Sequence, residues 1–251
     1  MRIFIFRKKN ILYILFILTV FISCSILYSF ATTSHNDSSF IQNVNNIYSS
    51  KEKIAFLTFD DGPTIRSTPY ILDILKEEDI KATFFVIGKY VEHHPDLVKR
   101  AYEEGHYLAN HTYSHDNSIL YKNQDNFINE IQKTDTAISE AIGIDYHSYL
   151  FRFPNGYMGN SHKKQKKIYG KILNDMGYAY IDWNCLNNDS TKKYSKAQLL
   201  NNLISSSKNK SVLVILMHDT KDVSDSSAVL KDSIDYLRSQ GYSFKNFYDL
   251  K

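Results

Sequence analysis

Hydrophobic and polar positions follow two alternating periods along most of the chain. From Lys53 onward, short apolar runs typical of buried strands alternate with longer stretches in which apolar residues recur every three or four positions. We predict strands at residues 54–59, 82–87, 107–109, 149–153, 178–183, 212–217 and 242–247. Helical periodicity lies between them, at residues 68–78, 95–104, 125–142, 163–176, 196–206 and 226–239. Repeated βα units of this size predict an α/β protein with a parallel sheet, either open or closed as a barrel.

Polar side chains suited to chemistry come at, or just after, the C-terminal ends of these strands. They are Asp60, Asp61, His111, Arg152, Asp189 and His218. In a βα barrel the active site is built at this rim. The sequence therefore predicts that residues far apart along the chain meet in one site.

Asp60 and Asp61 are adjacent carboxylates at the end of the first strand, followed by the turn residues Gly62 and Pro63. Like charges this close raise one another's pKa, so such a pair is typical of a place where a cation lies between the groups or one carboxylate has a separate role. The sharp turn would hold both carboxylates on a rigid rim. A solvated turn is the alternative for this tetrapeptide taken alone.

His111 and His115 are four residues apart, so on one helical turn their imidazoles would face the same way and could share a metal. With Asp61 they form a set of two histidines and one carboxylate, which leaves open positions as in a catalytic metal site. We expect a divalent metal, Zn²⁺ first, with Co²⁺ or Ni²⁺ as alternatives. Non-haem iron oxygenases use the same set, but hydrolysis is the simpler use where no other cofactor motif is present.

The start of the chain differs from the rest, because a basic flank precedes a long uncharged apolar stretch. Arg2, Arg7, Lys8 and Lys9 come before residues 11–31, a stretch longer than the roughly 7 to 15 residues of a signal-peptide core and long enough to cross a bilayer. The positive flank should stay in the cytoplasm, which places the following chain outside. We therefore expect a single-pass protein of the cell membrane with an extracellular domain. A protein secreted after signal cleavage is the alternative.

We divide the chain into a membrane anchor (1–31), a tether rich in Ser, Asn and Thr (32–52) and a folded domain (53–251). The anchor holds four of the 30 basic residues and none of the 27 acidic ones, so the remainder is nearly neutral and has no nucleic-acid footprint. The cysteines are Cys24 and Cys185, which rules out a disulfide framework for the outer domain. We expect a monomer.

Residues 53–251 resemble a polysaccharide deacetylase of carbohydrate esterase family 4, the NodB homology domain, with five motifs in the family's order. The resemblance implies a distorted (β/α)7-type barrel. In the first motif it implies that Asp60 is the general base and Asp61 a metal ligand. In the second it implies that His111 and His115 complete the ligand set.

The third and fifth motifs supply the remaining catalytic groups that the resemblance implies. Arg152 would hold the base carboxylate, and the backbone amide at Asn155 would help stabilise an oxyanion. Leu216 would line the acetate pocket, and His218 would be the general acid. The chemistry is consistent, because a metal can lower the pKa of water from about 15.7 to about 7 while a carboxylate takes the proton and a cationic histidine protonates the leaving amine.

The fourth motif departs from the family's Asp-Trp pair, and two aspartates are candidates for the partner of His218. We align the later one, Asp189, with that partner, which leaves Ser190 where an aromatic wall residue is common. Asp182 is then expected to serve structure at the strand end, while Trp183 is a candidate sugar-binding residue. Asn155 also stands where an aromatic or basic residue is common.

These features predict a metal-dependent deacetylase that hydrolyses the N-acetyl group of N-acetylglucosamine residues in a cell-wall polysaccharide, with peptidoglycan as the first substrate and N-acetylmuramic acid as a less favoured target. The partner expected is therefore an acetylated glycan. One alternative is an O-acetyl esterase acting on xylan or an exopolysaccharide, since the same site cleaves esters more easily than amides. Another is a non-catalytic glycan-binding relative, although a binder would not need the base, the ligands and the acid together.

Overall fold

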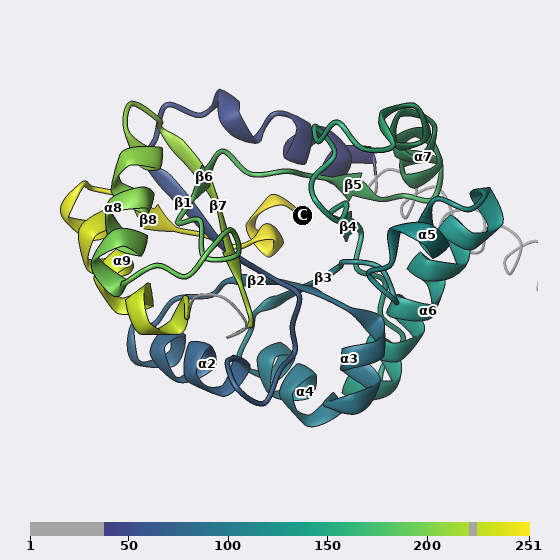
Figure 1. The fold of residues 1–251 in the computed structure, drawn as a ribbon, viewed down its shortest axis with the longest axis horizontal. Coiled ribbons are helices and arrows are strands. Elements are labelled where there is room, and N and C mark those ends of the chain that lie inside the picture. Colours follow the sequence, from purple (N-terminus) through teal and green to yellow (C-terminus); the bar gives the residue numbers. More distant parts are fainter. Residues whose placement is uncertain (1–37, 221–224) are drawn as a thin grey trace, which may run out of the picture.

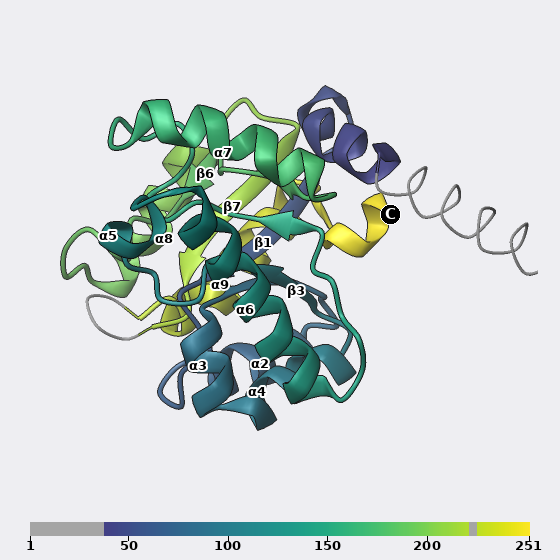
Figure 2. The same cartoon turned by 90° about the vertical axis from the view of Figure 1, so that its right-hand side faces the viewer.

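The computed structural model describes residues 38–220 and 225–251, which form a curled sheet with helices around its outside (Figure 1). The strands are β1 (Ile54–Asp60), β2 (Thr83–Val86), β3 (Tyr107–Asn110), β4 (Leu150–Phe151), β5 (Ala179–Tyr180), β6 (Cys185–Leu186), β7 (Val212–His218) and β8 (Ser243–Phe244). The helices are α2 (Thr68–Glu77), α3 (Gly88–His93), α4 (Pro95–Glu103), α5 (Asn117–Leu120), α6 (Gln124–Ile142), α7 (Lys163–Asp175), α8 (Lys196–Ser207) and α9 (Ser227–Ser239), with 3-10 helices η1 (Ile47–Ser49) and η2 (Phe247–Leu250). In both views α7 lies on the opposite side of the sheet from α2 and α4 (Figure 2).

The strands pair in the order β5-β4-β3-β2-β1-β7-β6, every pair is parallel, and β8 pairs with β1. β1 is central: β7 pairs along all of it, whereas its other edge is shared by β8 at Ile54–Ala55 and by β2 at Thr58–Asp60. Among the described strands no pairing joins β5 to β6. The parallel α/β sheet is thus confirmed, and it curls into a half-barrel consistent with the predicted barrel.

The predicted strand at 178–183 is confirmed only at β5 (Ala179–Tyr180); β6 (Cys185–Leu186) was not predicted and lies on the opposite edge of the sheet. The chain crosses the open seam between them within residues 181–184. The N–H of Ile181 still donates to Phe151 on the β4 side (3.1 Å), and the N–H of Asn184 donates to Val214 in β7 (3.1 Å). Residues 178–186 therefore contribute to both edges of the sheet, and the alternation of apolar and polar residues along them did not reveal the break.

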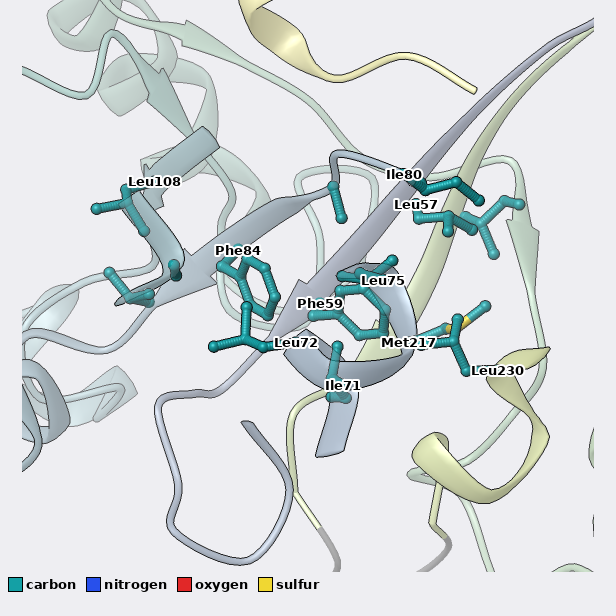
Figure 3. Close-up of a cluster of buried hydrophobic side chains, with 14 of the residues drawn as sticks. Leu57, Phe59, Ile71, Leu72, Leu75, Ile80, Phe84, Leu108, Met217 and Leu230 are labelled. Atoms are coloured by element: carbon teal, nitrogen blue, oxygen red, sulfur yellow. The ribbon is translucent and has the colours of Figure 1, made fainter. Parts of the chain in front are cut away.

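The alternation of side chains along β1 divides them between two cores, because successive residues of a strand point to opposite faces. Ala55, Leu57 and Phe59 belong to the outer cluster, under α2, α4 and α9, and Figure 3 shows Leu57 and Phe59 among side chains of α2. Ile54 and Phe56 belong to the inner cluster. Each fully buried Leu or Phe contributes about 1.5 to 3 kcal/mol, so these two clusters fix the strand in the sheet.

The interior of the half-barrel changes from apolar to polar toward the C-terminal ends of the strands. At the apolar end, η2 contributes Phe247, whose ring lies 5.2 Å from that of Phe56 and 6.2 Å from that of Tyr107. The next inward positions of β1 are Thr58 and Asp60, and both are buried. The same sequence alternation that builds the core therefore delivers polar groups to the rim.

The described part of the predicted tether is folded onto the domain. Residues 38–45 are helical and are followed by η1. Phe40, Val44 and Ile47 are buried in the inner cluster, and Phe40 stacks on Tyr107 at 6.3 Å. Phe40, Val44 and Ile47 are spaced four and three residues apart, which is a helical pattern, although the segment is rich in Ser and Asn.

Each predicted helix is confirmed to within one residue at either end, whereas α3 and α5 were not predicted. Both are too short, at six and four residues, for a periodic pattern to register. No helix within residues 38–220 and 225–251 is long and apolar enough to cross a membrane. The predicted anchor at 1–31 lies outside the described residues.

Candidate active site

The register of the sheet brings the ends of several strands to one level. Asp60 in β1 is paired with His218 in β7, and Asn110 in β3 is paired with Phe151 in β4. The residues that directly follow these positions therefore emerge at the same rim. All the polar residues predicted from strand ends lie there, on a parallel sheet whose strands are buried on both faces.

Asp61, His111 and His115 form the candidate metal centre. One ligand atom from each lies within 4.8 Å of the other two. Asp61 Oδ1 is 3.5 Å from His111 Nε2 and 3.4 Å from His115 Nε2, yet this buried oxygen has no hydrogen bond of normal geometry within the described residues. Although burial raises the pKa of Asp61, the imidazoles beside it outweigh that effect and hold the pKa well below its usual range. The group is therefore an anion suited to a cation.

Both histidines direct Nε2 toward this carboxylate. His111 Nδ1 lies 2.9 Å from the carbonyl oxygen of Arg152, which can only accept, so Nδ1 carries a proton and the lone pair of the neutral ring is at Nε2. Burial, followed by the nearby His111, lowers the pKa of His115 to about 4. The lowered pKa favours the neutral form of His115, which is the form that binds a divalent metal.

The histidines converge through a loop, and the predicted helical turn is wrong. Residues 111–115 contain no helix, and both Thr112 (φ 71°) and His115 (φ 55°) have left-handed backbone conformations. From α6, Glu130 accepts hydrogen bonds from the backbone N–H and the hydroxyl of Ser114, both at 2.8 Å. The buried Glu130 therefore helps to hold the loop in which the two histidines come together, a role that the sequence led us to assign to a helical turn.

Asp60 is held away from the ligand role by Arg152. The fully buried guanidinium donates through Nη1 to Asp60 Oδ1 (2.7 Å) and to Thr58 Oγ1 (2.8 Å), and through Nε to the carbonyl of Ile181 (3.1 Å). Asp60 Oδ2 lies 3.8 Å from His111 Nε2, on the side of the candidate metal centre. One oxygen is thus fixed while the other faces the place where chemistry would occur.

The predicted contact between Asp189 and His218 is present. Asp189 Oδ1 lies 2.6 Å from His218 Nδ1, and Asp189 Oδ2 accepts the backbone N–H of His218 at 2.7 Å and the hydroxyl of Ser226. Burial lowers the pKa of His218, but the hydrogen bond and charge of Asp189 outweigh it and raise the pKa to about 9. His218 is therefore cationic at neutral pH and can donate a proton from Nε2.

Asp182 has a structural contact instead. Its two oxygens accept the backbone N–H groups of Tyr157 (2.6 Å) and Met158 (2.8 Å). Among the described residues, Asp182 forms no hydrogen bond with His218. The same loop is held from α7, where the buried Lys166 donates to the carbonyl of Gly156 at 2.5 Å.

The residues predicted to contact substrate surround this centre, and their roles stay predictions. Asn155 is exposed and has a left-handed backbone (φ 60°). Leu216 faces inward from β7 and is 6% exposed. Trp183 is half-buried in the seam, 5.7 Å from the guanidinium of Arg152. Ser190, in the departing motif, is exposed.

Asp219 is a site residue that the sequence did not single out. It directly follows His218, is fully buried, donates its N–H to the carbonyl of Asp60 (2.7 Å) and accepts the hydroxyl of Thr68 on Oδ2 (2.6 Å). Burial raises the pKa of Asp219 to about 7. A Cβ at Gly62 would lie 2.1 Å from Oδ2, so only glycine fits in the turn after the paired aspartates. In the sequence, the one indication that Asp219 belongs to the site is that it directly follows His218, the predicted acid.

A cavity of about 470 Å³ opens beside the centre, lined partly by Asp61 and His115. Its other walls come from the loop after β1, from α3 and from the loop that carries the histidines. A small acyl group could therefore enter from solvent through this cavity and reach a divalent ion bound by the three ligands.

A parallel half-barrel with a two-histidine, one-carboxylate cluster, a buried carboxylate and an Asp-paired histidine at one rim is the arrangement of a hydrolase. The family model described as polysaccharide deacetylase matches residues 48–181. The chain belongs to the polysaccharide deacetylase family and is a hydrolytic deacetylase.

Comparisons with individual proteins support the same family. The chain is 32% identical over 200 residues to a peptidoglycan N-acetylmuramic acid deacetylase of Bacillus subtilis, with 80% of this chain and 72% of the relative covered. It is 36% identical over 204 residues to a peptidoglycan N-acetylglucosamine deacetylase of Bacillus cereus, with 79% and 71% covered. Among solved structures, a CE4 esterase from Streptococcus mutans superposes with a TM-score of 0.74 at 29% identity, covering 82% of this chain and 90% of that one.

Proposed function

We propose that this protein is a metal-dependent N-deacetylase that removes acetyl groups from N-acetylglucosamine residues of peptidoglycan. The observation that carries the proposal is the arrangement of Asp60 and His218 on adjacent strands, beside the cluster of Asp61, His111 and His115. A base, an acid and three ligands around one open cavity supply each group that amide hydrolysis needs.

The three ligands fit a divalent metal. Asp61 Oδ1 is buried without a regular hydrogen bond, and His111 is fixed in the tautomer that leaves Nε2 available. One carboxylate and two imidazoles favour Zn²⁺, while Co²⁺ and Ni²⁺ accept the same donors. When bound, such an ion supplies Lewis acidity toward the acetyl carbonyl and toward water.

The residues of the chain account for the proton transfers of the reaction. Asp60, with one oxygen held by Arg152, accepts the proton of the attacking water on the other. The acetyl carbon–nitrogen bond breaks as His218 donates the proton held at Nε2 to the leaving amine, which yields acetate and a free amino sugar. We assign to the backbone amide at Asn155, in a loop held by Asp182 and Lys166, the role of stabilising the negative charge that would develop on the acetyl oxygen.

Peptidoglycan is proposed as the polymer because two relatives that are 32% and 36% identical to this chain over the aligned residues are named as acting on it. We also propose that residues 1–31 anchor the protein in the cell membrane with the catalytic domain outside. Their sequence supports this, since a basic flank precedes an uncharged apolar stretch.

The test is acetate release from defined substrates by the metal-loaded protein. Purified peptidoglycan and N-acetylglucosamine oligomers should yield acetate, and the products should contain free amines. Acetylated xylan serves as the O-ester comparison, and Asp60→Asn is the inactive control. Acetate from xylan alone would favour the esterase alternative, and acetate from neither class would contradict the proposal.

A further inference from the structure

The cavity beside the candidate metal centre is basic. The residues that line it include Arg66, Lys89 and His94, whereas the carboxylate among its described lining residues is Asp61, which faces the candidate metal centre. With Asp61 committed to a cation, the ammonium of Lys89 and the guanidinium of Arg66 are the charges that the described lining residues add to this wall. A wall of this kind attracts an anionic group on a ligand that already has its acetyl group at the centre.

Lys89 is the best-placed cation of this wall. Its ammonium donates to the carbonyl of Ser114 at 2.8 Å, and its backbone N–H donates to Tyr113 at 3.0 Å. The charge also lies 5.1 Å from the centroid of the Tyr90 ring. Lys89 is thus tied to the loop that carries the histidine ligands, and two of its three ammonium protons are left for a ligand.

Apolar surface completes the cavity. Ile65 is 67% exposed and lies beside Pro63 on the loop after β1, and Tyr90 presents a half-buried ring from α3. Exposed apolar groups next to directed charges suit a sugar that carries an acidic substituent, since its ring face is apolar and its substituent is not.

We propose that this cavity, defined by Arg66, Lys89 and Tyr90, is a subsite for a carboxylate that the glycan carries close to the reacting sugar. The inference rests on the proposed function and adds substrate selectivity to it. In a peptidoglycan strand that has lost its stem peptides, each N-acetylglucosamine neighbours a muramic acid whose lactyl ether ends in a free carboxylate, whereas in a strand with stem peptides this carboxyl is an uncharged amide. The enzyme should therefore prefer acidic glycans to neutral N-acetylglucosamine oligomers of equal length.

The experiment compares tetrasaccharides that differ in this one group. The acidic substrate alternates N-acetylglucosamine with muramic acid bearing a free lactyl carboxylate, the neutral substrate is chitotetraose, and a third substrate has the lactyl groups converted to amides. Deacetylation of each is followed by acetate release at low and at high salt. The wild-type KM is expected to be about tenfold lower for the acidic substrate than for the other two, and salt should narrow the gap.

Variants separate the subsite from the catalytic centre. Lys89→Gln should raise KM for the acidic tetrasaccharide about five- to tenfold with kcat preserved, and should leave chitotetraose within twofold. Arg66→Gln should act in the same direction, while Lys89→Arg should restore the preference. The control is Lys99→Gln, which removes an exposed charge on α4, away from the cavity. Thermal unfolding of each variant checks that it is folded.

Three results would overturn the subsite: equal KM values for the acidic and amidated substrates, equal losses of Lys89→Gln on acidic and neutral glycans, or no loss on either. Calorimetric binding of the same tetrasaccharides gives a readout independent of turnover. If none is deacetylated, the proposed function fails, but tighter binding of the acidic one that Lys89→Gln abolishes would still support the subsite. Equal binding of all three would contradict it.

Discussion

At the scale of single residues, the two adjacent aspartates differ because their partners differ. Asp60 is paired through one oxygen with a buried guanidinium, while Asp61 faces two imidazoles and has a buried oxygen without a hydrogen bond of normal geometry among the described residues. The residue types and their strand-end positions could be predicted from the sequence. The left-handed backbone at His115 could not, because it depends on the loop's contact with Glu130, which is 15 residues further along the chain.

This difference predicts opposite effects of two substitutions on metal content. Asp60→Asn should keep the bound metal and lower kcat by about 10² to 10⁴, because it removes the proton acceptor alone. His111→Ala should lose both the metal and activity. Metal content is measured by atomic emission after dialysis, with thermal unfolding as the check on folding. Metal loss in Asp60→Asn, or full occupancy in His111→Ala, would show that the roles are assigned wrongly.

The pairing of His218 with Asp189 predicts a change in the pH profile. His218 must be protonated to act as an acid, so activity is retained below its pKa of about 9 and falls as the pH rises through that value. Asp189→Asn removes the charge that raises this pKa, and the alkaline limb should move to lower pH by about one unit or more. The measurement is kcat/KM from pH 5 to 10. An unchanged alkaline limb would mean that Asp189 does not tune the acid.

The buried carboxyl group of Asp219 leads us to predict that replacing it increases the stability of the fold in a pH-dependent way. Burial raises its pKa from 3.8 to about 7, so the folded state is penalised as the pH rises from the lower value through the higher one, and the full penalty applies above pH 7. Asp219→Asn keeps an acceptor for Thr68 without the charge. In metal-free protein, its melting temperature should exceed that of the wild type by several degrees at pH 8 and match it near pH 4. A lower melting temperature at pH 8 would show that the carboxylate stabilises the fold.

At the scale of elements, long periodic segments could be predicted and short or split ones could not. α6 and α7 repeat an apolar face over several turns, and their ends are within one residue of those predicted. α5 has four residues, and β5 and β6 have two residues each. Their form depends on the half-barrel seam and on contacts across the rim, which a local pattern does not contain.

The helical segment at 38–45 predicts that the chain before β1 contributes to stability. Phe40 is 2% exposed against Tyr107, so Phe40→Ala should lower the free energy of unfolding by about 3 kcal/mol. For a domain of this size, that corresponds to a fall in melting temperature of roughly 6 to 12 °C. The matched control is Gln42→Ala on the exposed side of the same helix, which should change little. Equal melting temperatures for both variants would contradict the packing.

At the scale of the whole molecule, the folded domain begins closer to the predicted anchor than composition indicates. Only residues 32–37 separate the end of that anchor from the first described helical residue, Ser38. Six residues span at most about 20 Å, from about 3.3 to 3.6 Å for each residue of a fully extended chain. If the anchor is retained, the catalytic rim works near the outer membrane face, where new wall strands emerge.

Retention of the anchor predicts where the protein is found. Membranes separated from the medium and the cytoplasm should contain nearly all of the protein, and alkaline carbonate should not release it, because an apolar stretch of this length leaves the bilayer at a high cost in free energy. N-terminal sequencing of the recovered protein should begin at or near Met1. A variant that carries residues 32–251 behind a cleavable export signal is the control, and it should appear in the medium with its deacetylase activity intact, since the folded domain starts beyond the predicted anchor. Native protein that is free in the medium and starts near Ala31 would contradict anchoring, and its access to wall polymers would then be set by diffusion instead of by a link to the membrane.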